Sequence, residues 1–236
     1  MTTLSYVGQE LDVFAHATQW KKYWSSEIQV YLAGDVLEVG AGIGSNTEVM
    51  QNSRVSSWTC LEPDPALADR MRARFQSSAE LAPCQVVVGT TEIIPANQQS
   101  YDAIVYIDVL EHIAEDRAEL ARASQLLRTG GRILVLAPAH QWLFAPFDRA
   151  IGHVRRYDRE TLSACTPSDC RLERLAYLDS AGMLASLGNR LFLRQAAPGL
   201  NQILFWDRFL VPFSRFIDPI TFHKIGKSIL GIWKKG

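Results

Sequence analysis

Short apolar segments recur along the chain, and between several of them the apolar residues have the spacing of a helix. The short segments predict strands, because they end at glycine, proline or polar residues after a few apolar positions. These predicted strands lie at 35–40, 58–62, 85–88, 101–107, 132–136, 171–177 and 228–233. Helices are expected over 46–51, 66–77 and 113–127, the last of them stopped by Gly130 and Gly131. Strands that alternate with helices in this way predict βαβ units and a parallel sheet.

Two further regions have apolar positions at helical spacing outside this alternating pattern. Residues 1–33 predict helices that lead into the first strand, and residues 178–226 predict a helical, aromatic-rich insertion before the final strand. Pro212 is expected to kink or break a helix of this insertion. We therefore expect one domain. Its parts are an N-terminal helical cap at 1–33, a core at 34–177, the insertion or lid at 178–226 and the final strand at 227–236.

The insertion holds six of the ten phenylalanines of the chain. One interpretation is a helical cover that buries these rings against the sheet. The alternatives are an apolar tunnel for a substrate, the contact face of a dimer, or a surface that rests on a membrane. Charged residues interrupt the segment, so we expect it to lie at a surface and not to span a bilayer. The six are Phe192, Phe205, Phe209, Phe213, Phe216 and Phe222.

The first predicted strand runs into a turn with three glycines at alternate positions. Glu38 belongs to the strand, and Gly40, Gly42 and Gly44 follow it. Glycine lets a turn approach a ligand closely because it has no Cβ. A strand, such a turn and a helix together predict a ligand site at the carboxyl edge of the sheet. A nicotinamide dinucleotide fingerprint would need a glycine where the chain has Ser45, which argues against that cofactor.

Composition limits the partners and the location of the protein. The 236 residues are 47% hydrophobic and 21% charged, with a net charge of −1, which is typical of a soluble globular domain. This charge gives no general attraction to nucleic acid or to an anionic membrane. We find no secretion signal and no uncharged apolar run of about 18 residues. We expect a cytoplasmic protein, monomeric or homodimeric, with its four cysteines reduced and with no metal site.

Four features resemble, in order and spacing, the class I S-adenosylmethionine-dependent methyltransferases. They are the glycine turn after Glu38, the acid Glu62 after the second strand, the sequence Asp-Val-Leu-Glu-His at 108–112, and Gly130-Gly131 before the fifth strand. The resemblance covers about residues 30–140. It implies an α/β fold with a Rossmann-like seven-stranded sheet, mostly parallel, with helices on both faces and the last strand antiparallel. It also implies S-adenosylmethionine as cofactor and S-adenosylhomocysteine as product.

The resemblance also assigns residues to the cofactor. Glu62 would accept both hydrogen bonds of a ribose diol, although a carboxylate there could instead favour the N-terminus of the following helix. Thr90 stands where the family often has an acid for the adenine amino group, so its hydroxyl or a backbone carbonyl would serve. Asp108 would lie near the transferred methyl, and Tyr23 or Trp20 could close over the cofactor or pack in the core. The full set is Glu38, Gly40, Ala41, Gly42, Gly44, Glu62, Pro63, Thr90, Thr91, Ile107, Asp108, Val109 and Tyr23.

The segment after the fifth strand carries the candidates for the acceptor side. It resembles a pattern in a bacterial subgroup of these enzymes: Pro-x-His, an aromatic residue, an Asp, then Gly-His-x-Arg-Arg-Tyr. His140 is the first candidate for a general base or substrate orienter and His153 the second, because histidine titrates near neutral pH; either could instead be structural. Arg155 and Arg156 could clamp an anionic substrate group or pair with acids to hold the loop. The candidate substrate residues are Trp142, Phe144, Asp148, Arg155, Arg156 and Tyr157.

These features favour methyl transfer to a small, partly apolar molecule through an oxygen, nitrogen or carbon acceptor. A nucleic-acid substrate is not expected, because the chain has no basic groove and no nucleobase motif. Contact with a membrane surface stays open. One alternative function is a protein that keeps the cofactor without transferring its methyl, such as a cyclisation catalyst. A nicotinamide oxidoreductase is the less favoured alternative.

Overall fold

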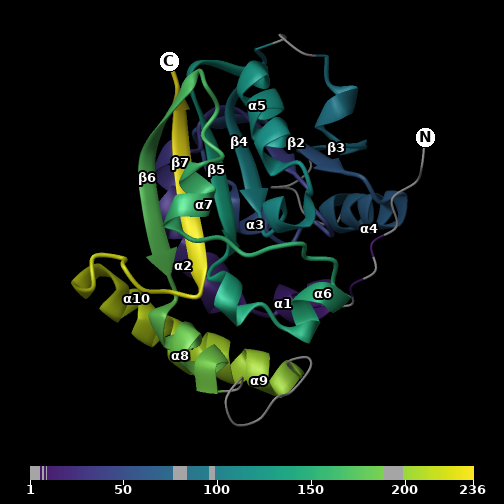
Figure 1. The fold of residues 1–236 in the computed structure, drawn as a ribbon. Helices are drawn as coiled ribbons and strands as arrows, with labels where there is room; N and C mark the ends of the chain where they lie inside the picture. Colours follow the sequence, from purple (N-terminus) through teal and green to yellow (C-terminus); the bar gives the residue numbers. More distant parts are fainter. Residues whose placement is uncertain (1–5, 7, 9, 77–83, 96–98, 189–198) are drawn as a thin grey trace.

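A single twisted sheet forms the centre of the protein (Figure 1). The computed structural model describes residues 6, 8, 10–76, 84–95, 99–188 and 199–236. The strand order is β3-β2-β1-β4-β5-β7-β6, and β7 is antiparallel to both of its neighbours. The strands are β1 Gly34–Val39, β2 Val55–Glu62, β3 Cys84–Val88, β4 Tyr101–Ile107, β5 Leu127–Pro138, β6 Cys170–Leu178 and β7 Ser228–Lys235. The predicted fold class is thereby confirmed, with each predicted strand in place.

Helices cover both faces of the sheet (Figure 1). One face packs against α2 Thr18–Ile28, α3 Thr47–Met50 and α4 Pro65–Gln76. The opposite face packs against α5 Asp116–Leu126 and α7 Arg159–Ser163. The remaining short helices are α1 Glu10–Ala15 and α6 Pro146–Ala150, with 3-10 turns at Gln29–Tyr31, Thr91–Ile93, Leu110–His112 and Gln141–Leu143.

The parallel register brings the ends of the central strands together. In β1, Glu38 pairs with Cys60 of β2 on one side and with Val105 of β4 on the other. The loops after these strands therefore emerge side by side at the carboxyl edge, which is where open α/β sheets bind ligands.

The glycine pair expected to stop a helix lies inside a strand instead. Helix α5 already ends at Leu126, and β5 begins at the next residue and contains Gly130 and Gly131. The pairing of β4 with β5 shifts register at this point, and Gly130 has a φ of +81°. The two glycines thus form a bulge, where extra residues and a positive φ are tolerated. The prediction of a helix stop was wrong.

The insertion is helical and lies beyond the carboxyl edge of the sheet (Figure 1). It contains α8 Ser180–Gly188, α9 Leu200–Phe205, a π-helical stretch at Trp206–Leu210 and α10 Val211–Ile220. Pro212 falls in the first turn of α10, where a missing N–H is tolerated. The helix therefore continues through Pro212, with the π-helical stretch before it as the irregularity.

Buried aspartates tie the helices of the insertion to one another just beyond the end of β6. The Asp179 carboxylate accepts hydrogen bonds from Trp206 Nε1 at 2.8 Å and from the Ser214 hydroxyl at 2.7 Å. The Asp218 carboxylate accepts from the backbone N–H of Asp179 at 2.6 Å and from that of Ser180 at 3.1 Å. Both carboxylates are inaccessible to solvent.

The phenylalanine rings of the insertion face outward. Phe205, Phe209, Phe213, Phe216 and Phe222 are between 55% and 77% exposed, whereas Trp206 is buried. Phe192 lies outside the described residues. The interpretation of a cover that buries these rings was therefore wrong for the five that the structure describes. No helix of the described residues is long and apolar enough to cross a membrane.

Candidate active site

A cavity of about 1800 Å³ opens at the carboxyl edge of the sheet. Its walls come from the glycine turn, the ends of β2 and β4, helices α1 and α2, the segment 138–156 and the helices α8 and α9. A site for one small molecule typically measures about 300–1,000 Å³. The cavity therefore has room for two reactants.

The three glycines of the turn have different surroundings. A Cβ on Gly40 would lie 2.7 Å from Val109, and one on Gly44 would lie 2.6 Å from Phe75, so both positions exclude a side chain by packing. A Cβ on Gly42 would meet nothing closer than Leu11 at 3.7 Å. Gly40, Ala41 and Gly42 line the cavity, whereas Gly44 packs behind the turn.

Glu38 lies behind the turn and not in the cavity. Its Oε2 atom accepts hydrogen bonds from the Thr47 hydroxyl at 2.7 Å and from Trp58 Nε1 at 3.0 Å. Burial raises the pKa of this carboxyl to about 7. Glu38 therefore ties α3 and β2 to β1 and orders the turn from behind.

Glu62 lies at the cavity wall with its carboxylate held by the backbone. Oε2 accepts the N–H of Gly42 at 2.8 Å, and Oε1 accepts the N–H of Asp64 at 2.9 Å. A carboxylate oxygen can accept two hydrogen bonds, so each keeps capacity for a ligand. The helix-terminus role belongs to Asp64, which accepts from the N–H of Ala66 at 2.7 Å at the start of α4. The Glu62 carboxylate therefore keeps the capacity to accept hydrogen bonds from a diol.

Several other expected cofactor residues also line the cavity. Asp108 has a φ of +54°, and its side chain is exposed at the cavity. Partial desolvation by the surrounding cavity walls raises the pKa of its carboxyl to about 6. Thr91 lines it too, although its hydroxyl donates to Glu119 at 2.9 Å. The expected cofactor residues on the wall are Gly40, Ala41, Gly42, Glu62, Pro63, Thr90, Thr91, Ile107, Asp108 and Val109.

Tyr23 lies away from the cavity. It is 1% exposed, and its hydroxyl donates to Asp218 at 2.7 Å. Its neighbour in α2, Trp20, does line the cavity. Of the two residues considered for covering a cofactor, Trp20 is thus in position and Tyr23 packs in the core.

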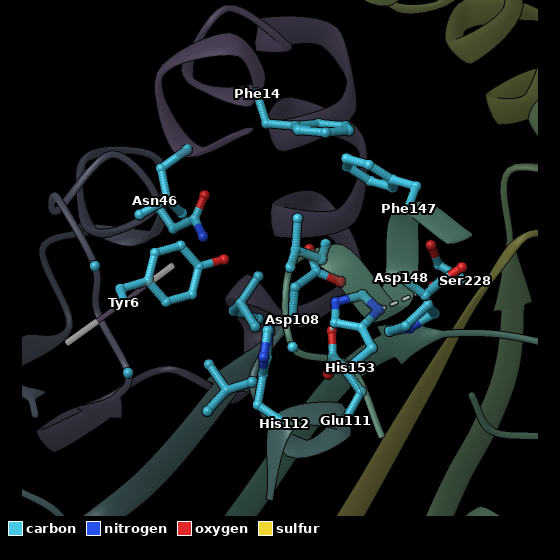
Figure 2. Close-up of a pocket in the computed structure, with 18 of the residues that line it drawn as sticks. Tyr6, Phe14, Asn46, Asp108, Glu111, His112, Phe147, Asp148, His153 and Ser228 are labelled. Atoms are coloured by element: carbon cyan, nitrogen blue, oxygen red, sulfur yellow. Dashed lines mark hydrogen bonds and ion pairs between the residues drawn. The ribbon is translucent and has the colours of Figure 1, made fainter. Parts of the chain in front are cut away.

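Five polar side chains form one side of the cavity, here called the polar wall: Glu111, His112, Asp148, His153 and Arg156. The first four of them are labelled in Figure 2. The Asp148 carboxylate accepts from His153 Nδ1 at 2.9 Å and from Arg156 Nε at 2.8 Å. Burial opposes its ionisation, but these two hydrogen bonds prevail and lower its pKa to about 2. Burial lowers the pKa of His112 to about 4.

Glu111 is the least satisfied group of the polar wall. It is inaccessible to solvent, and neither carboxylate oxygen has a hydrogen-bond partner among the described residues. Nε2 of His153 lies 3.6 Å from its Oε1 atom. Burial raises the pKa of Glu111 well above its ordinary value.

The preferred histidine of the sequence analysis, His140, lies outside the cavity lining. Its ring stacks on Tyr177 with centroids 4.7 Å apart, and Nε2 lies 3.0 Å from the carbonyl oxygen of Gly226. Trp142 packs beside it and is 48% exposed. Phe144 does not line the cavity either, whereas Phe147 does.

Only one of the two arginines, Arg156, lies at the cavity, and the other holds the loop. Arg156 lines the cavity and pairs with Asp148. Arg155 is outside the lining and pairs with Asp116 at 2.5 Å, and the Tyr157 hydroxyl donates to the same carboxylate at 2.8 Å. Arg155 and Tyr157 therefore hold the loop against α5.

Comparisons with known proteins bear on this arrangement. The family model described as a methyltransferase domain matches residues 37–135. This match supports, for residues 37–135, the resemblance to the class I S-adenosylmethionine-dependent methyltransferases. A demethylmenaquinone methyltransferase of Tropheryma whipplei (strain Twist) is 26% identical over 137 residues, which cover 58% of this chain. The match spans about half the length of that relative, 55%.

Two solved structures share the fold of this chain. Geranyl diphosphate C-methyltransferase from Streptomyces coelicolor A3(2), solved with Mg²⁺, geranyl diphosphate and S-adenosylhomocysteine, has a TM-score of 0.65 at 14% identity. That match covers 97% of this chain and 83% of the other. The [4+2]-cyclase SpnF has a TM-score of 0.60 at 13% identity, with 92% and 80% covered.

Sequence reasoning missed several residues that line the cavity. Phe14 and Phe147 lie across the cavity from Glu111 and His112 (Figure 2). Lys227, just before β7, also lines it, with its ammonium 3.7 Å from the centroid of Trp206. The aromatic spacing of the N-terminal region indicated helices but not which ring would face a ligand.

Proposed function

We propose that this chain binds S-adenosylmethionine and transfers its methyl group to a small, partly apolar molecule. The observation that carries the proposal is the Glu62 carboxylate, held by the N–H of Gly42 at the mouth of the glycine turn and open to a cavity large enough for two molecules. A neighbour of the same fold was solved with S-adenosylhomocysteine, the product form of the cofactor, which is consistent with this assignment.

The cofactor would occupy the side of the cavity formed by the strand ends. Glu62 would accept the hydrogen bonds of the ribose diol, and Thr90, which lines the cavity, would lie beside the adenine. The methionine part would lie along Gly40 and Gly42, with Asp108 near its amino group and Trp20 over it.

The acceptor would occupy the space between the aromatic residues and the polar wall. Phe14, Phe147 and Ile203 give this space an apolar side, which favours a partly apolar acceptor. The sulfonium already activates the methyl, so the protein contributes mainly proximity and orientation. His153 is the candidate to act on the acceptor, because it lines the cavity and His140 does not.

A direct test is incubation of the purified protein with tritium-labelled S-adenosylmethionine and a panel of small apolar alcohols, phenols, amines and quinols. Labelled product together with S-adenosylhomocysteine is the expected result. A protein that binds no S-adenosylmethionine by calorimetry would contradict the proposal. Mass spectrometry of molecules that co-purify in the cavity would narrow the acceptor class.

A second candidate function is a catalyst that keeps the cofactor and does not transfer its methyl. The fold shared with the [4+2]-cyclase SpnF is the observation in its favour. This candidate predicts cofactor binding and conversion of a ligand without release of S-adenosylhomocysteine. Product formation measured beside S-adenosylhomocysteine release separates the two functions.

A further inference from the structure

On the polar wall, a buried carboxylate lies close to two imidazole rings, and the three groups do not satisfy one another's hydrogen-bonding capacity. One ligand atom each from Glu111, His112 and His153 lies within 4.8 Å of the others. Glu111 has no hydrogen-bond partner among the described residues for either oxygen. A carboxylate removed from water needs a compensating charge, because its isolated burial is very costly.

His153 is held in the form that a metal ligand needs. Nδ1 lies 2.9 Å from the Asp148 carboxylate, which also accepts from Arg156. Nδ1 therefore carries a proton, and Nε2, which holds the lone pair of the neutral ring, lies 3.6 Å from Oε1 of Glu111. A carboxylate behind a histidine in this way fixes the tautomer and orientation of metal ligands.

We propose that Glu111, His112 and His153 bind a divalent transition-metal ion. Two imidazoles and one carboxylate form a ligand set that suits Zn²⁺, Mn²⁺, Fe²⁺ or Co²⁺ and leaves coordination positions open. Mg²⁺ fits less well because it prefers oxygen ligands. Small side-chain rotations bring the three ligand atoms to bonds of about 2.0–2.2 Å.

The position of the ion links it to the acceptor. The three ligands line the same cavity as Asp108, and Glu111 and His112 follow the carboxyl end of β4 as Asp108 does. The open coordination positions would hold an oxygen of the acceptor near the transferred methyl. This last step rests on the proposed function, whereas metal binding does not.

The test uses the whole chain after treatment with a chelator. Titration with Zn²⁺ by calorimetry, and with Co²⁺ by visible absorption, should show one ion per chain. Glu111→Gln and, separately, His153→Asn should weaken binding at least tenfold. The matched controls are Glu92→Gln, an exposed acid of the same cavity, and His16→Asn, an exposed histidine, and both should bind as the wild type does.

Thermal unfolding shows whether the variants remain folded. Without metal, Glu111→Gln should melt no lower than the wild type, because the amide has nearly the shape of the carboxyl and the change breaks no hydrogen bond among the described residues. Added Zn²⁺ should raise the melting temperature of the wild type and not that of Glu111→Gln. A wild type that takes up no ion, or a Glu111→Gln variant that binds as tightly, would overturn the metal site. Neither result depends on methyl transfer.

A different observation supports a second inference. The outward side chains of α9, the π-helical stretch and α10 form an apolar surface, here called the aromatic surface: Leu204, Phe205, Phe209, Phe213, Phe216 and Ile220, each between 42% and 70% exposed. Exposed apolar surfaces of this kind mark sites of interaction. Phe205 also lines the cavity, so the surface adjoins the cavity.

The charges around the aromatic surface have one sign. The acidic residues of 199–225 are Asp207 and Asp218, and both are buried. The basic residues Arg208, Arg215 and Lys224 are exposed. The outward face is therefore apolar and positively charged, although the whole chain has a net charge of −1.

We infer that the aromatic surface docks on a lipid bilayer that contains anionic lipids. Aromatic rings enter the headgroup region, and exposed Arg and Lys side chains are attracted to anionic headgroups. The arrangement would place the cavity next to the bilayer, which is where an apolar acceptor would be dissolved.

Sedimentation with vesicles tests this inference. The protein should bind vesicles of phosphatidylcholine and phosphatidylglycerol, and bind phosphatidylcholine alone at least tenfold less. Phe213→Ser/Phe216→Ser should lose binding, whereas Val30→Ser, which changes an exposed apolar residue at 65% exposure elsewhere, should keep it. Failure to bind the mixed vesicles would overturn the inference. So would a self-association that the double substitution abolishes, since that result would assign the surface to a second copy of the chain.

Discussion

Nδ1 of His153 lies 2.9 Å from Oδ1 of Asp148, and this contact decides which ring nitrogen faces the cavity. Asp148 has a pKa of about 2, so its carboxylate is ionised near neutral pH and can only accept hydrogen bonds. Nδ1 must therefore carry a proton, and in the neutral ring Nε2 presents the lone pair. The contact with Asp148 therefore fixes which ring nitrogen of His153 faces the cavity. His140 has no corresponding role, because it does not line the cavity.

Substitution of Asp148 by Asn should lower kcat about 100-fold or more, because the amide can hold the wrong tautomer of His153. Cofactor affinity should change little, since Asp148 lies on the polar wall away from Glu62. Turnover and calorimetric cofactor affinity are measured together. Asp158→Asn removes a carboxylate that caps α7 outside the cavity, and should lower thermal stability while kcat stays near the wild-type value. Equal kcat for Asp148→Asn and the wild type would contradict the role of the pair.

Substitution of Glu62 by Ala should weaken S-adenosylmethionine binding by more than tenfold. The change removes the acceptor for the diol and also the anchor of the Gly42 N–H at 2.8 Å. Isothermal calorimetry measures the affinity. Asp64→Asn is the matched control: it alters the cap of α4 and should lower the melting temperature with less effect on affinity. Near-wild-type affinity in Glu62→Ala would reject the ribose assignment.

The sheet and the cofactor side were predictable from sequence for local reasons. Each strand is a short apolar segment with a clear end, and the positions of Glu62 and Asp108 follow from strand ends that must meet at one edge. The same local signals could not separate Gly130 in a bulge from a glycine that stops a helix, because both conformations need a positive φ.

The acceptor side was less predictable because it depends on which way a side chain turns after the strand. His140 lies just after the end of β5 at Pro138, has a φ of +65°, and stacks its ring on Tyr177. His153 is further along the chain but is brought to the cavity by its contact with Asp148. The spacing of residues in the sequence predicts neither a side-chain contact of this kind nor the outward direction of the phenylalanine rings.

Stability should depend on pH through Glu38. The pKa of this carboxyl is raised to about 7 in the folded state, so its favourable contribution is complete below about pH 4.5 and is lost as pH rises through 7. Relative to the wild type, Glu38→Gln should gain about 3 kcal/mol in unfolding free energy between pH 5 and pH 8. Chemical denaturation at both pH values measures this gain.

A control for Glu38 lies in the same strand. Hydrogen bonds from Ser57 and Arg128 lower the pKa of Asp35, so its contribution is present above the ordinary carboxyl pKa and is lost only in acid. The effect of Asp35→Asn should therefore be the same at pH 5 and pH 8. If the effect of Glu38→Gln is equally independent of pH, Glu38 does not titrate near neutrality.

Substitution of Tyr23 by Phe should lower the unfolding free energy by about 1–2 kcal/mol, because it removes one hydrogen bond from the buried Asp218 carboxylate. Cofactor affinity should stay within about twofold of the wild type, since Tyr23 does not line the cavity. Tyr31→Phe is the control. The Tyr31 ring is only partly buried and lies at the end of the same helical region, so loss of its hydroxyl should lower the unfolding free energy less. Tenfold weaker cofactor binding in Tyr23→Phe would place the residue at the cofactor after all.

The Asp218 carboxylate joins parts of the chain that are far apart in sequence: it binds the Tyr23 hydroxyl of α2 and the N–H groups of Asp179 and Ser180. Helix α2 also carries Trp20 at the cavity, and α10 carries the outward rings. Local opening of α10 must therefore break the hydrogen bond between Asp218 and Tyr23 of α2, a helix that lines the cavity. Binding of a ligand in the cavity should therefore slow amide hydrogen exchange in α10, even though Asp218 does not line the cavity.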